Sequence, residues 1–408
     1  MKYIPLEKTD TGRGGYQQKV KEANIKRIFD LVRFGKCKSR AEIVRNMDLS
    51  ATSVSVLVEE LAGRGLVAEV GPTQTSLPGR RPISLRLNSE AHQIVVFALS
   101  RHGVRYTLLN LDCEVLESRT AALETDGMTG EEAAAAFIRL FDQLLKRRSR
   151  LYDPRRALVI GISVPGLYLN SCGLFYNRTA LGVSLPEGPF VEYQRRVGLP
   201  LYMLNDTRCM AYAEKRFLDA ADPEAPEVEN LIYMNVHKSL SCAVITRGDL
   251  YAGPFNIAGQ IGHTTIDFNG RPCHCGSRGC LARYVNRDAI LEDAQQAAAA
   301  AGVQPPESLE ALAQRCADEP ALRDALRSSA RMLAAGLYSA MCGTGLRRIV
   351  ITGVECLGEA FLEMVREALL ERSLLVRTLD LSYAQAGPDA QALGLAQHYL
   401  DKVFTVTG

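Results

Sequence analysis

The sequence predicts a chain of two parts: a winged helix-turn-helix domain at residues 1–88 and an α/β body of two lobes at residues 89–408. Three observations lead to this fold class. The chain has 408 residues, which is more than one hydrophobic core supports. Its charge is distributed unevenly, and its hydrophobic pattern changes from short helices to alternating strands and helices near Asn88. Apolar residues make up 47% and charged residues 23%, which excludes a disordered or fibrous chain.

The net charge of +2 hides an asymmetry. Residues 1–88 contain 16 Lys and Arg against 9 Asp and Glu, whereas residues 89–408 contain 32 against 37. The first part therefore carries +7 and the second −5. A basic segment attached to an acidic body is typical of a protein in which only one part binds a polyanion. Charge alone leaves a merely solvated basic surface equally open.

Targeting signals and disulfides are not expected. No window approaches 18 uninterrupted apolar residues, and the first residues lack the apolar segment of a signal peptide. The sequence therefore predicts a cytoplasmic protein without membrane insertion. The eleven cysteines are odd in number, so reduced thiols or metal ligands are favoured over a disulfide framework.

The basic segment shows three short helical patterns, at residues 24–34, 40–47 and 51–63. Ser39 and Ser50 stand where N-caps of the second and third helices are needed. Two strand-like runs follow, at 66–70 and 82–87, with Gly, Pro and Arg between them. A supporting helix, two helices joined by a tight turn and a hairpin are the elements of a winged helix-turn-helix.

The third helix begins with small hydroxyl side chains, which can approach a DNA duplex closely and hydrogen-bond phosphates or base edges. Arginines at the tip of the hairpin could enter a minor groove or pair with phosphates. The alternative is a three-helix packing module with exposed serines. The residues predicted to contact DNA are Ser39, Ser50, Thr52, Ser53, Ser55, Arg80 and Arg81.

After Asn88 the pattern predicts strands at 93–99, 106–111, 115–118, 157–164, 201–204, 231–236, 243–246 and 348–352. A helix is expected at 131–147 and a helix-rich stretch at 288–340. Alternating strands and helices over this length predict an α/β body with a cleft between its lobes.

A cluster of three cysteines lies in CHCGSRGC, residues 273–280, and a histidine precedes it. Cys273, Cys275, Cys280 and His263 supply a tetrahedral Cys₃His set, and the glycines permit the tight turns that such a site needs. His274 is expected to point outward. Four protein ligands close the site, so the sequence predicts structural zinc rather than a hydrolytic centre. The alternative is a set of free cysteines in a glycine-rich loop.

Asn205 and Asp206 follow an apolar run at 199–204. A polar pair at the carboxyl end of a strand stands where α/β proteins bind ligands. The aspartate could accept a proton from a polyol hydroxyl while the asparagine orients it. An ordinary turn is the competing interpretation.

Together these segments resemble the ROK family, which comprises sugar-responsive repressors and sugar kinases on an actin-like, ribonuclease-H-like fold. The resemblance covers nearly the whole chain. The motifs that carry it are GRRP at 79–82, GISVPG at 161–166, LND at 204–206, GQIGH at 259–263 and CHCGSRGC at 273–280.

The resemblance implies zinc ligands at His263, Cys273, Cys275 and Cys280, and hinges between the lobes near residues 205 and 385. It also implies sugar contacts at Asn205, Asp206, Gln260, His263 and Gly166. The N-terminal domain places the chain in the repressor branch.

The chain departs from the kinase pattern in both phosphate loops. Residues 98–105, ALSRHGVR, lack the Asp and the paired glycines of a DxGGTK-like loop, and residues 237–241, HKSLS, contain no glycine. Asp206 is then a vestigial base, and no catalytic residue and no kinase activity are expected. Gln260 and Ala282 stand where the family has two glutamates. The effector could therefore be an acidic sugar, a phosphorylated sugar or a non-sugar compound, or the pocket could bind no effector. Arg283 could meet an anion, although a surface position is favoured.

The sequence thus predicts a transcriptional repressor that binds a palindromic DNA operator as a homodimer or tetramer and responds to a sugar or sugar derivative. A sugar kinase with an added DNA-binding domain is the first alternative. A scaffold that binds another protein through its acidic body is the second.

Overall fold

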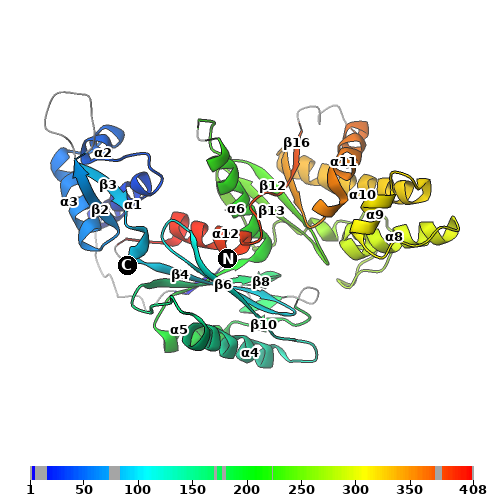
Figure 1. Ribbon diagram of the computed structural model, residues 1–408, viewed down its shortest axis with the longest axis horizontal. Coiled ribbons are helices and arrows are strands. Elements are labelled where there is room, and N and C mark those ends of the chain that lie inside the picture. The colour runs from blue at the N-terminus through cyan, green and yellow to red at the C-terminus, as the bar shows by residue number, and fades with distance from the viewer. Residues whose placement is uncertain are drawn as a thin grey trace.

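The computed structural model describes residues 2–4, 16–72, 83–169, 172–176, 181–222, 224–372 and 379–406. Figure 1 shows a small helical module at one end, a large α/β body and a helical layer at the opposite end. The two-lobed body that the sequence predicts is confirmed. Its lobes are built on a six-stranded and a five-stranded sheet.

The N-terminal module contains three helices and a hairpin, as predicted. They are α1 (Tyr16–Arg33), α2 (Arg40–Asn46), α3 (Ala51–Gly63), β2 (Val67–Pro72) and β3 (Ile83–Leu87). Ser39 Oγ accepts from the N–H of Glu42 and Ser50 Oγ from that of Ser53, so both predicted caps are present. Helix α1 begins eight residues earlier than residue 24, where its apolar pattern starts, because its first two turns are mostly polar.

The first lobe is a six-stranded sheet in the order β1-β11-β7-β4-β5-β6. Its strands are β1 (Lys2–Ile4), β4 (Gln93–Ser100), β5 (Gly103–Leu109), β6 (Val115–Ala122), β7 (Ala157–Val164) and β11 (Leu201–Asn205). Helices α4 (Gly130–Gln143) and α5 (Gly188–Val197) cover one face. Alternate side chains of β4 enter two different cores: Val95 and Phe97 face α4, whereas Ile94 and Val96 face the opposite side.

Strand β1 was not predicted from the sequence. Residues 2–4 precede the helical module in the chain, yet they pair antiparallel with β11 and form the edge of the body sheet. Tyr3 is in register with Tyr202. The N-terminal module is therefore joined to the first lobe by chain on both sides, through β1 before it and β4 after it.

The second lobe is a sheet in the order β14-β13-β12-β15-β16, covered on one face by helices. Its strands are β12 (Leu231–Val236), β13 (Leu240–Thr246), β14 (Asp249–Tyr251), β15 (Arg348–Thr352) and β16 (Asp380–Tyr383). Its helices are α7 (Ala282–Val285), α8 (Arg287–Ala300), α9 (Leu309–Arg315), α10 (Pro320–Thr344) and α11 (Gly358–Arg372). A small sheet of β8 (Leu167–Leu169), β9 (Leu174–Tyr176) and β10 (Leu185–Pro186) extends the first lobe.

Two crossing helices join the lobes. Helix α6 (Asp206–Ala221) packs on β12 and β13 of the second lobe, and α12 (Ala390–His398) packs on β4 and β7 of the first. They cross at Gly394, where an added Cβ would lie 1.7 Å from the carbonyl oxygen of Cys209. Only glycine therefore permits this close approach.

The module also packs directly against the body. Its core residues Ile25, Ile28 and Phe29 form one hydrophobic cluster with residues of α12 and the chain after it. The rings of Phe29 and Phe404 lie 5.6 Å apart, and Arg64 donates to the carbonyl of Val406. Among the described residues, no helix is both long and apolar enough to cross a membrane.

We predict that Gly394→Ala lowers the free energy of unfolding by about 1–3 kcal/mol, because the new methyl group forces α6 and α12 apart. Denaturant titration measures the change. Gly343→Ala, in the last turn of α10 with open space around the new Cβ, is the matched control and should be neutral or slightly stabilising. Equal effects of the two substitutions would contradict the tight crossing.

Candidate ligand pocket and metal cluster

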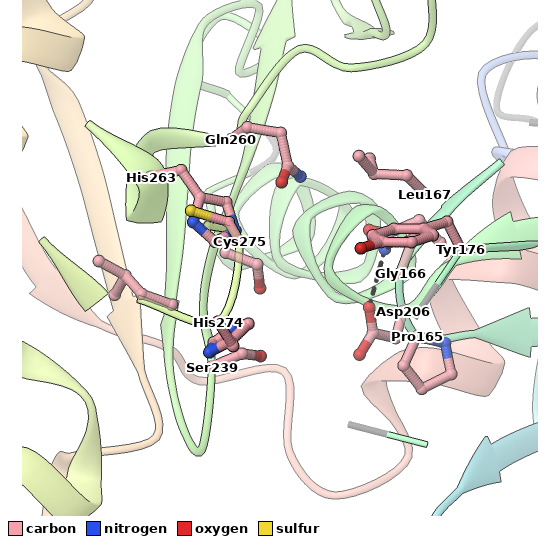
Figure 2. Close-up of a pocket in the computed structure, with 13 residues that line it drawn as sticks. Pro165, Gly166, Leu167, Tyr176, Asp206, Ser239, Gln260, His263, His274 and Cys275 are labelled. Atoms are coloured by element: carbon pink, nitrogen blue, oxygen red, sulfur yellow. Dashed lines mark hydrogen bonds between the residues drawn. The ribbon is translucent and has the colours of Figure 1, made fainter. Parts of the chain in front are cut away.

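A cavity of about 340 Å³ lies between the two lobes. Figure 2 shows its two walls facing each other, with Asp206, Gly166 and Tyr176 on one side and Gln260, His263 and His274 on the other. All five residues predicted to contact a ligand line this cavity, so the structure brings them together. The lining residues are Pro165, Gly166, Leu167, Tyr176, Asn205, Asp206, Ser239, Leu240, Ser241, Gln260, His263, His274 and Cys275.

Asn205 and Asp206 are held by the start of α6. Asn205 Oδ1 caps the helix by accepting from the N–H of Arg208 at 3.1 Å, and its amide donates to the carbonyl of Gly166 at 2.8 Å and to Asp206 at 2.9 Å. The left-handed backbone of Gly166, with φ of 102°, brings that carbonyl to the asparagine. The pair therefore belongs to a helix N-terminus rather than to an ordinary turn.

The carboxyl group of Asp206 is desolvated at the base of the pocket, which raises its pKa to about 6. Hydrogen bonds from Thr207 and Asn205 favour the charged form but do not outweigh desolvation. At neutral pH the group is mostly an acceptor, suited to a ligand hydroxyl.

The loop before β13 approaches α6 across the pocket. Thr207 Oγ1 and Ser241 Oγ are hydrogen-bonded at 2.6 Å, which links the first turn of α6 to β13. Ser239 and Leu240 line the cavity where a kinase-like loop would carry glycines. At the other altered loop, Arg101 pairs with Asp126 at 2.6 Å. Side chains thus line the cavity at the first altered loop, whereas Arg101 at the second is engaged in a surface ion pair.

The predicted metal ligands form a compact cluster. Ligand atoms of His263, Cys273, Cys275 and Cys280 all lie within 4.8 Å of one another. The Sγ atoms of Cys275 and Cys280 are 3.6 Å apart, and Cys273 Sγ is 3.7 Å from His263 Nδ1. These separations match the edges of a tetrahedron with metal–ligand bonds of about 2.0–2.3 Å. The cluster can hold a metal ion.

The protonation chemistry of these groups fits a metal ion. Desolvation lowers the pKa of His263, which keeps its imidazole neutral, the form that binds metals. Burial raises the pKa of Cys280 to about 12, whereas the backbone N–H of Ser277 lowers the pKa of Cys275. A bound cation would be needed to keep Cys280 as a thiolate at neutral pH.

Some site residues differ from what the sequence suggests. His274 lines the pocket, with its ring 5.9 Å from that of His263, although it is expected to point outward. Ala282 is buried in the core of the second lobe rather than in the cavity wall, and Arg283 is not among the lining residues either. Tyr176 was not predicted as a site residue, because no motif in the sequence marks the short strand that carries it.

The residues predicted to contact DNA occupy different environments. Ser50, Thr52 and Ser53 are exposed at the start of α3, and Ser55 is half-buried. Ser39 is 2% exposed, and its hydroxyl is engaged as the cap of α2. Arg80 and Arg81 lie outside the described residues.

Fold and site together define a class: a two-lobed body with a ligand pocket and a Cys₃His cluster, preceded by a helix-turn-helix module with a hairpin. The chain belongs to the ROK family, whose model matches residues 100–402. The xylose repressor of Caldicellulosiruptor bescii is 31% identical over 67% of this chain and 66% of its own length. The DNA-binding transcriptional dual regulator NagC of Escherichia coli is 28% identical over 66% and 64%. These matches thus span slightly less than two thirds of either relative.

Solved structures show the same fold. A ROK family transcriptional regulator, described as a homologue of the E. coli MLC protein, superposes with a TM-score of 0.79 at 23% identity and covers 94% of this chain and 97% of its own. The ROK hexokinase of Thermus thermophilus gives a TM-score of 0.58 at 22% identity, over 74% and 96%. The hexokinase thus matches a smaller share of this chain than the regulator does.

We predict that the stability difference between Asp206→Asn and the wild type depends on pH. Because the folded pKa of about 6 exceeds the ordinary 3.8, the stability that protonation of Asp206 supplies is complete below 3.8 and is lost as pH rises through 6. The asparagine avoids this loss. The variant should therefore be more stable than the wild type at pH 8 by about 1–3 kcal/mol, and the gap should shrink towards pH 4.5.

Denaturant titrations at the two pH values measure the gap. Glu367→Gln, which is exposed on α11, is the control and should give the same difference from the wild type at both. A destabilised Asp206→Asn variant at pH 8, or a gap independent of pH, would contradict the desolvation of Asp206.

Proposed function

We propose that this chain is a DNA-binding transcriptional repressor, acting in the cytoplasm, whose affinity for its operator is set by a sugar or sugar derivative in the pocket between the lobes. The proposal is supported by the presence, in one chain, of a module of the DNA-binding type and a body with a ligand-type pocket. A helix-turn-helix module exposes hydroxyl side chains on α3, and a kinase-like body retains the polar pocket but has altered phosphate loops.

A neutral polyhydroxylated ligand fits the pocket best. Asp206 supplies an acceptor, Asn205 and Gln260 supply amides, and Tyr176 offers an aromatic face. Among the described lining residues there is no Lys or Arg to balance an acidic or phosphorylated ligand. Relatives named for xylose and N-acetylglucosamine agree with this class of ligand.

The DNA contacts are assigned to Ser50, Thr52, Ser53 and Ser55 on α3 and to Arg80 and Arg81 in the hairpin. Ser39 is left out because its side chain is buried beneath the surface of the module, whereas Ser50 is exposed. A symmetric homodimer or tetramer on a palindromic operator is the arrangement that such modules use, and light scattering on purified protein tests it.

A sugar kinase with an added DNA-binding module is the second candidate. The similarity to the hexokinase fold and the retained Asp206 favour it. The segment from His237 to Ser241 disfavours it, because it contains no glycine whose backbone could approach phosphate groups, and Ser241 is bonded to Thr207. Consumption of ATP with any hexose or amino sugar separates the two candidates.

Zinc is the metal that we assign to the His263, Cys273, Cys275 and Cys280 cluster, since three thiolates and one imidazole at tetrahedral spacing select it. All four positions are filled by protein, so the ion would be structural. It would fix the loop that carries Gln260 and His263 against the pocket.

We predict that Arg80→Ala with Arg81→Ala weakens binding to any duplex and reduces the slope of log K against log salt by about 1.8, since each phosphate contact contributes about 0.9. Fluorescence anisotropy on duplexes selected from random sequence measures both quantities.

Xylose and N-acetylglucosamine should change the affinity of the wild-type protein for its selected duplex, and Asn205→Ala should abolish that change.

The matched control removes equal charge from the body, at the exposed residues Arg155 and Arg327. It should keep the wild-type slope. If wild-type protein selects no duplex above non-specific affinity, the proposed function fails.

We predict one zinc ion per chain by elemental analysis, and its loss in Cys280→Ser. The variant should also melt at lower temperature, because a structural metal stabilises only the folded state. Cys342→Ser, which replaces an exposed thiol outside the cluster, is the control and should retain the ion. Metal-free wild-type protein purified without chelators would refute the assignment.

A further inference from the structure

Helix α6 extends from the ligand pocket to the N-terminal module. Its first residues, with their cap Asn205, line the pocket, and its sixteen residues span about 24 Å. Tyr212 and Arg216, the seventh and eleventh residues of the helix, lie on the side of the module. The guanidinium of Arg216 lies 4.3 Å from the centre of the Phe34 ring, just beyond the end of α1. One rigid element therefore contacts both regions.

Asp401 joins this helix to α1. Its Oδ2 accepts from the hydroxyl of Tyr212 at 2.7 Å, and its Oδ1 accepts from Arg33 at 2.6 Å. The side chains of Arg33 and Asp401 are only 4% and 11% exposed. Burial alone would raise the pKa of Asp401, but the charges of Arg33 and Arg216 outweigh it and hold that pKa below its ordinary value. The carboxylate is charged, buried and shared between two domains.

Two further contacts hold the middle of α6 in place. Glu214 is fully buried, and its carboxylate accepts from the backbone N–H groups of Gln385 and Ala386 at 2.9–3.1 Å. The close crossing at Gly394 fixes the same helix against α12. A shift of its first turn is therefore carried along its length rather than absorbed by bending.

A cavity of about 370 Å³ borders the shared carboxylate. Its wall includes Asp30, Phe34, Tyr212, Arg216 and Asp401. Because polar groups line it, water can solvate the carboxylate when its contacts open. This part of the junction between module and body is therefore polar, in contrast to the hydrophobic contact of Phe29 with Phe404.

We propose that α6 transmits the state of the ligand pocket to the N-terminal module, and that Asp401, held between Tyr212 and Arg33, is the positioning residue through which it does so. As a means of regulating DNA binding, this coupling rests on the proposed function. The physical coupling itself requires neither DNA nor a known ligand.

Hydrogen–deuterium exchange on the full-length protein tests the coupling. Asn205→Ala perturbs the pocket end of α6, and we expect it to speed exchange of the α1 backbone amides by about 3-fold or more. Tyr212→Phe removes a single hydroxyl and keeps the ring. In that background the effect of Asn205→Ala on α1 should fall by half or more, because the helix loses its hydrogen bond to Asp401 and only the contacts of Arg216 remain.

The control breaks another contact between module and body. Lys36 and Glu227 form an exposed pair at 2.7 Å, and Lys36→Gln should leave the effect of Asn205→Ala on α1 intact. Where Asn205→Ala does not fold, Ser241→Ala, which removes the hydrogen bond to Thr207 in the first turn of α6, replaces it as the pocket perturbation.

The proposal is overturned if the pocket substitution changes exchange in α6 but not in α1. It is equally overturned if the change in α1 persists in full with Tyr212→Phe. Both results are independent of DNA binding, so a chain that binds no operator but shows the coupling would contradict the proposed function alone.

Discussion

The arrangement of the domains depends on polar and charged side chains that are buried along α6 and need partners. A buried charge without a partner is strongly destabilising, so each of these groups must be satisfied by a neighbour. The neighbours belong to different segments: Arg208 donates to Asn256, Glu214 accepts from the 385–386 backbone, and Tyr212 donates to Asp401. The helix is thereby fixed to segments that follow β14 and β16 of the second lobe and to Asp401, which binds Arg33 of the N-terminal module. Helix propensity alone would not require any of these contacts.

The two walls of the pocket differ in structure. One wall is the capped start of α6, where backbone N–H groups and Asn205 position the carboxyl of Asp206. The other is a loop with little regular structure, which carries Gln260 and His263. Such a loop needs a cross-link to hold its side chains in place, and the Cys₃His cluster supplies ligands for one. The pocket thus combines the capped start of a helix with a loop whose Cys₃His cluster can hold a metal ion.

Local patterns in the sequence were sufficient to predict much of this structure. The strands at 157–164, 231–236 and 348–352, the caps Ser39 and Ser50 and the Cys₃His set all depend on neighbouring residues and are present. Helix α6 was missed because its many buried polar residues obscure the apolar pattern, although the Asn205 cap was a usable signal. The contact between Arg33 and Asp401 joins residues 368 positions apart, which no local pattern can indicate. The burial of Ala282 depends on tertiary packing in the same way.

The pairing of β1 with β11 affects the order in which the protein is assembled. Tyr3 is synthesised long before its partner Tyr202, and at about 5–20 residues per second the delay is on the order of 10–40 s. The helices of the N-terminal module need only each other and the adjacent hairpin for most of their core, so they can fold within that delay. Their final attachment waits for β11 and then for Asp401, near the end of translation. The N-terminal module is therefore complete in sequence well before the segments of the body that hold it in position have been synthesised.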